Sequence, residues 1–143
     1  MTEDTLHLLK ECDAGCKTAV NSIKEVLDNT KSEKLLETLT LSLERHQRLG
    51  DEIHEKLSEE GKDGKKPNVM ARAMSWIKIN AKIMAEPSDS TIANLMTDGC
   101  HMGIKQLGVY KNQYPDADED AMRLTDKLIK EEERLAQELK EFL

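Results

Sequence analysis

The sequence predicts a soluble, single-domain, all-α protein: a four-helix bundle with an additional short helix in one long connection. Charged residues make up 34% of the chain and aromatic residues only 3%, a composition typical of helices and poor in the residues that favour sheets. Apolar side chains recur at helical spacing along most of the chain. Its 143 residues are enough for one core without disulfides or metal, so the predicted domain covers 1–143.

Two long amphipathic segments open the chain. The first helix is predicted over about 2–29, with an apolar stripe that stops before Asn29. Thr30 and Glu33 form a capping-box pattern, which predicts that the second helix begins there and covers about 31–60. The stretch GKDGKKP that follows is predicted as a loop, because it is rich in turn-forming residues.

Three further helices follow the loop. The shortest is predicted over 68–85, ending before Pro87, and the next over 89–113, ending before Pro115. The last is predicted over 117–142, after the capping pattern of Asp116 and Glu119.

Helix lengths predict the topology. The four long segments each span roughly 40 Å at 1.5 Å per residue, and the short connections within the first and last pairs force antiparallel hairpins. The helix over 68–85 spans roughly 27 Å, enough to return the chain to the starting end. The prediction is therefore an up-down-down-up bundle with one long crossover, the ferritin-like arrangement.

Charge and cysteine content restrict the classes of partner and compartment. The net charge of −7 argues against nucleic-acid binding, but residues 61–85 alone carry +5. That basic crossover helix either binds an acidic protein partner or only solvates its lysines while its apolar face covers the bundle. No apolar run approaches a membrane span, and three cysteines without a signal peptide indicate reduced thiols and a cytoplasmic protein.

Two polar residues fall near the centres of apolar stripes, each at the midpoint of its helix. They are His46 in the second helix and Glu132 in the last. Antiparallel pairing places Cys16 level with His46, with Cys12 one turn away and Asp13 at the edge of the same face. The same reasoning places Gly99 level with Glu132, and Gly103 one turn further on; Cys100 is interpreted as a small flanking residue.

Two interpretations of this central layer compete. In the first, His46 and Glu132 form a buried hydrogen-bonded pair that fixes helix register, since a buried carboxylate needs a partner. In the second, they bind one transition metal, iron or zinc, with Cys16, Cys12 or Asp13 as further ligands.

Two segments and the order of the helices carry a family resemblance. They are Glu11-Cys12-Asp13-Ala14-Gly15 and Met74-Ser75-Trp76-Ile77-Lys78, with the fourth predicted helix ending near Tyr110. The chain resembles the small bacterial ferritin-like bundles that are grouped as a domain of unknown function.

The resemblance implies a carboxylate-bridged centre with two iron or manganese ions. Such a centre needs a Glu from each of two helices and a Glu-x-x-His motif from each of the others. In this chain Leu43 stands three residues before His46, and Leu135 stands three residues after Glu132, so neither residue is part of a Glu-x-x-His motif.

The leading hypothesis is therefore a non-enzymatic bundle with a degenerate metal centre. It would act through protein contacts or in stress, and a homodimer would form through leftover apolar faces. A mononuclear metal-binding protein is the alternative, and a di-iron oxidase is a remote one.

Overall fold

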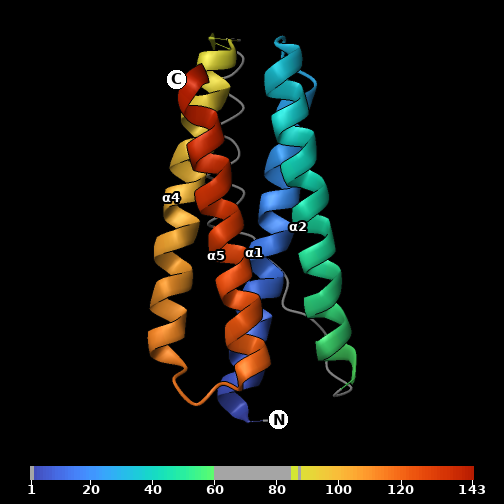
Figure 1. Cartoon of the computed structure of the whole chain (residues 1–143), viewed down its shortest axis with the longest axis vertical. Helices are drawn as coiled ribbons and strands as arrows, with labels where there is room; N and C mark the ends of the chain where they lie inside the picture. The colour runs from blue at the N-terminus through green and yellow to red at the C-terminus, as the bar shows by residue number, and fades with distance from the viewer. Residues whose placement is uncertain (1, 60–84, 87) are drawn as a thin grey trace.

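The computed structural model describes residues 2–59, 85–86 and 88–143, and long helices occupy nearly all of them. The elements are α1 (Glu3–Leu27), α2 (Glu33–Glu59), α4 (Asp89–Gln113), α5 (Glu119–Leu139) and the short 3₁₀ helix η1 (Lys140–Phe142). Figure 1 shows the four long helices side by side along one axis. All regular structure in the described part of the chain is helical, which confirms the all-α four-helix bundle.

The helices run up, down, down and up in chain order (Figure 1). Each of α1 and α5 packs against both α2 and α4, and α1 also approaches α5 across the bundle. The helices therefore occupy the corners of a square in the order α1, α2, α5, α4. The parallel helices α2 and α4 lie on one diagonal, as expected when a long crossover joins them.

Hydrogen bonds at the two ends of the bundle hold this topology. At one end, the carboxylate of Asp89 accepts the backbone N–H groups of Lys31 and Ser32 at 2.8 and 2.9 Å, which ties the start of α4 to the start of α2. At the opposite end, the hydroxyl of Thr5 in α1 accepts the N–H of Asp118 at 2.7 Å, just before α5 begins. The two helices of each parallel pair, α2 with α4 and α1 with α5, therefore begin at the same end of the bundle.

Two helices, α2 and α5, start two residues later than predicted. Ser32 caps α2 by accepting the N–H of Leu35 at 3.2 Å, whereas the Thr30 hydroxyl donates to the carbonyl of Val26 at the end of α1. Likewise Asp118, not Asp116, caps α5. Both corrections arise where several capping residues follow one another, so the chain geometry decides which of them caps the helix.

The predicted crossover helix over 68–85 lies outside the described residues except for Ala85, and so do its basic side chains. Among the helices that are described, none is long and apolar enough to cross a membrane.

The core consists of two apolar clusters stacked along the bundle axis. One includes Ile23, Leu39 and Leu135, and the other includes Leu9, Ile53 and Leu128. His46 and Glu132 fall between these levels in their helices, so a polar layer separates two apolar halves.

Candidate functional site

The central polar layer is built on a contact between α2 and α5. The ring nitrogen Nε2 of His46 lies 2.5 Å from Oε1 of Glu132. His46 is 0% exposed and Glu132 is 8% exposed. The two residues singled out by their positions on apolar stripes therefore meet directly across the bundle.

The other ring nitrogen of His46 is also occupied. Nδ1 donates to the backbone carbonyl of Ser42, one turn earlier in α2, at 2.8 Å. This bond fixes the ring orientation and places a proton on Nδ1. The remaining proton lies between Nε2 and the carboxylate of Glu132.

Contacts within the layer favour the charged imidazolium. Burial lowers the pKa of His46, but the hydrogen bond and charge of Glu132, the Ser42 carbonyl and the charge of Glu131 together raise that pKa above its usual 6.5. His46 and Glu132 therefore behave as a buried ion pair that shares one short hydrogen bond.

A second ion pair adjoins the first. Glu131 is 6% exposed, and its Oε1 accepts from Nε of Arg45 at 2.6 Å while its Oε2 accepts from the Ser42 hydroxyl at 2.9 Å. Sequence reasoning did not single out these residues. At 100° per residue Glu131 lies about 100° from Glu132, at the edge of the α5 stripe, and Arg45, next to His46 in α2, was the available signal that Glu131 was paired.

Two thiols border Glu132 from the other pair of helices. The thiol of Cys100 in α4 hydrogen-bonds to Glu132, and burial, followed by this carboxylate, raises the Cys100 pKa well above its usual range. Burial also raises the Cys16 pKa strongly, with Cys12 and Glu132 adding to the shift. Both thiols therefore stay protonated, and Cys100 belongs to the layer instead of only flanking it.

Cys12 and Asp13 have partners of their own outside this layer. The Cys12 sulfur lies 3.2 Å from the hydroxyl of Thr125, and burial raises its pKa to about 11. Asp13 is 2% exposed, and its carboxylate accepts from Lys17 at 2.7 Å.

Gly103 leaves space for the Glu132 side chain on the α4 side. A Cβ at this position would lie 3.6 Å from Oε2 of Glu132. Gly103 is half-buried, and the Glu132 side chain that it faces is 10% exposed. A Cβ at Gly99, by contrast, would meet no atom within 4 Å, so Gly99 does not border the layer.

The arrangement does not fit the dinuclear centre that the resemblance implies. Within residues 2–59, 85–86 and 88–143, no three His, Cys, Asp or Glu side chains are grouped so that they could hold a metal ion. Leu43 and Leu135 stand where the additional ligands would be needed, and the nitrogens of His46 already have protein partners.

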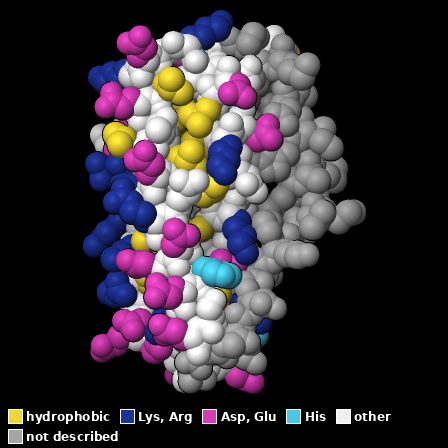
Figure 2. Space-filling view, turned by 90° about the vertical axis from the view of Figure 1, so that its right-hand side faces the viewer, with side chains coloured by type: hydrophobic (Ala, Val, Ile, Leu, Met, Phe, Trp, Pro, Cys, Tyr) yellow, Lys and Arg dark blue, Asp and Glu magenta, His cyan; other side chains and the backbone are white. Residues whose placement is uncertain are grey.

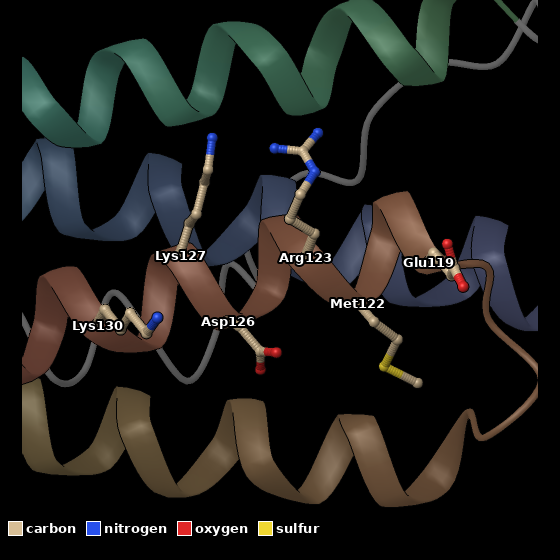
Figure 3. A pocket seen from close by; sticks show the side chains of 6 residues that line it. All are labelled: Glu119, Met122, Arg123, Asp126, Lys127 and Lys130. Carbon is tan, nitrogen blue, oxygen red and sulfur yellow. The ribbon is translucent and has the colours of Figure 1, made fainter.

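A shallow surface pocket lies on α5, away from the polar layer (Figure 3). Its charged side chains are largely neutralised: Asp126 accepts from Lys111 at 2.6 Å, and Lys127 lies 3.7 Å from Glu52. The lining residues are Glu119, Met122, Arg123, Asp126, Lys127 and Lys130. One helix supplies them all, which gives no converging set of groups for catalysis.

Comparisons with known proteins support the fold alone. No protein-family model matches the chain, and no curated protein matches its sequence. Among solved structures, the chain is similar to YcfI from Rhodopseudomonas palustris, described as "a putative structural protein", with a TM-score of 0.77. The sequences are 15% identical, and the alignment covers 95% of this chain and 90% of YcfI.

Proposed function

We propose that this chain is a non-enzymatic, ferritin-like bundle whose former metal position is now a structural polar layer, and that it acts through protein contacts at its surface. The saturated bonding of His46 carries the proposal. A histidine whose two nitrogens bond to Ser42 and Glu132 has no nitrogen to offer a metal or a substrate unless a buried ion pair breaks. The description of YcfI as a structural protein agrees with such a role.

The mononuclear metal site remains the second candidate because of one observation. Glu132 hydrogen-bonds to His46 and also interacts with the thiols of Cys16 and Cys100, so three groups of the kinds that ligate transition metals adjoin one carboxylate, although in the described part of the chain they are not grouped so that they could hold a metal ion as they stand. The metal would have to displace the proton shared by His46 and Glu132 and deprotonate thiols whose pKa values burial has raised.

Metal content of the purified protein distinguishes the two candidates. The protein would be prepared without chelator, analysed by mass spectrometry for iron, zinc and manganese, and compared with His46→Ala and with the surface variant His101→Ala. We expect substoichiometric metal in all three, with only His46→Ala losing stability. One metal per chain that disappears in His46→Ala alone would establish the mononuclear site, and two per chain would establish a dinuclear one.

A further inference from the structure

A column of apolar side chains follows the surface seam between α1 and α2 (Figure 2). Leu36 of α2 is 40% exposed, and Val20, Leu27 and Leu43 are half-buried. Their positions on the helices place Val20 and Leu27 on the edge of α1 that faces α2, and Leu36 and Leu43 on the edge of α2 that faces α1. These four residues are called the α1–α2 seam. Isolated exposed apolar residues are ordinary, so the seam needs further evidence before it indicates a partner.

Opposite charges border the seam on its two edges. On the α1 edge lie Lys17 and Lys24, and on the α2 edge lie Glu44 and Asp51, each pair seven residues apart and all four exposed. Seven residues are close to two helical turns, so each pair lies on one line along its helix. In Figure 2 basic side chains follow the right-hand edge of the middle of the apolar column and acidic side chains lie to its left, with further acidic side chains to the right of its upper end.

The two rows of charge are in register. Residues 16 and 50 are level, since a Cβ on Gly50 would lie 3.6 Å from Cβ of Cys16. In an antiparallel pair Lys24 is then level with Ser42, and Glu44 lies two residues beyond, about 3 Å along the axis. Lys17 and Asp51 have the same offset. If the acidic edge of one molecule faced the basic edge of a second at the same height, Lys24 would therefore lie near Glu44 of the other molecule, and Lys17 would lie near its Asp51.

In a symmetric dimer, the direction of the two-fold axis decides whether the acidic edge of one copy faces the basic edge of the other. A two-fold axis parallel to the helices brings one seam onto the other and places the basic edge of each copy against the acidic edge of its partner. A two-fold axis across the helices would instead set like charges together, which is unfavourable.

We propose that a second copy of this chain packs on the α1–α2 seam about a two-fold axis parallel to the helices, with Lys24 of each copy against Glu44 of the partner subunit. Among the described residues, neither Lys24 nor Glu44 has an ion pair within its own chain, whereas Lys17 already binds Asp13. The pair of Lys24 and Glu44 is thus the one free to form between copies. This inference deepens the proposed function by naming one partner, and it uses no residue of the polar layer.

Charge reversal tests the geometry directly. Dimerisation would be measured by analytical ultracentrifugation for the wild type, for Lys24→Glu and for Glu44→Lys. Each single variant should raise the dissociation constant at least about tenfold, because like charges then meet twice across the two-fold axis. An equal mixture of the two variants should recover dimers, since acid faces base at both contacts in the mixed pair. The double variant Lys24→Glu/Glu44→Lys should also recover them.

The matched control is Lys105→Glu, which reverses a lysine exposed on α4 and should dimerise like the wild type. Far-UV circular dichroism would verify that every variant is helical. A wild type that stays monomeric up to its solubility limit, a Lys24→Glu that behaves like Lys105→Glu, or a mixture that stays monomeric would each overturn the proposal. None of these results alters the metal measurement, so a failure here is distinct from a failure of the proposed function.

Discussion

At the scale of single residues, the dominant feature is a histidine and a carboxylate that each need the other. His46 is fully buried and Glu132 nearly so, and moving either charge from water into the bundle costs free energy that only its partner recovers. Ser42, Cys100 and the Arg45–Glu131 pair provide further bonds around them. The stability of the protein should therefore fall strongly when either His46 or Glu132 is removed alone, and much less when both charges are removed together.

Replacing either member alone should destabilise the protein strongly. His46→Leu leaves Glu132 without its imidazole, and we expect a loss of about 3–5 kcal/mol in the free energy of unfolding. Glu132→Leu should cost a similar amount. The double variant His46→Leu/Glu132→Leu should recover most of the loss, because an apolar pair replaces the ion pair. Urea unfolding of the four proteins measures the coupling between the two positions.

Glu133→Leu, at an exposed position beside Glu132 in α5, is the control and should change stability by no more than about 0.5 kcal/mol. Losses that simply add in the double variant would show that His46 and Glu132 are not coupled.

The same pair should make stability depend on pH. The pKa of His46 is raised in the folded state above its usual 6.5, so the pair's stabilising contribution is complete below that value and is lost as pH rises through the folded pKa. The neighbouring thiols do not change charge in this range, because burial keeps them protonated.

We therefore expect the stability difference between the wild type and the double leucine variant to shift against the wild type as the pH rises above 6.5, the usual pKa of histidine. Urea titrations at several pH values measure this difference. A constant difference, or one that shifts in favour of the wild type, would contradict a raised His46 pKa.

At the scale of helices, Asp89 acts on an element other than its own. Its two carboxylate oxygens accept the N–H groups of Lys31 and Ser32, which would otherwise lack partners at the start of α2. A negative charge at that end of α2 is also favourable toward the helix dipole. One side chain thus fixes where two parallel helices begin relative to each other.

Asp89→Ala should cost about 1–2 kcal/mol of unfolding free energy, and amide exchange should accelerate most in the first turn of α2. Asp89→Asn retains one acceptor and should lose less. Asp98→Ala, at an exposed position further along α4, is the matched control. Equal effects at positions 89 and 98 would show that the bond between the helix starts contributes nothing.

Helix existence was predictable from periodicity, but helix starts were less so. Capping residues cluster before α2, where Thr30 and Ser32 are both suitable, and before α5, where Asp116 and Asp118 are. The local pattern favours each candidate about equally. Contacts from distant segments select among them: Asp89 holds Ser32 in place, and Thr5 accepts the N–H of Asp118.

At the scale of the whole molecule, helix lengths and apolar stripes predicted more of the structure than local sequence motifs did. Four long segments, two short connections and one long one sufficed to predict the order up, down, down, up, because antiparallel hairpins and a spanning crossover allow few alternatives. Stripe centres likewise identified His46 and Glu132. Residues at stripe edges, such as Glu131 and Cys100, could not be assigned, since their burial depends on how the neighbouring helices are rotated.

The separation of the core into two apolar halves has a consequence for how such a sequence can drift over evolutionary time. Within each half, residues such as Leu39 and Leu128 can exchange for other apolar residues of similar volume, one at a time. The polar layer between the halves cannot change one residue at a time, because losing either His46 or Glu132 leaves the other buried without its partner. We expect lineages with this fold to keep both residues or to replace both together.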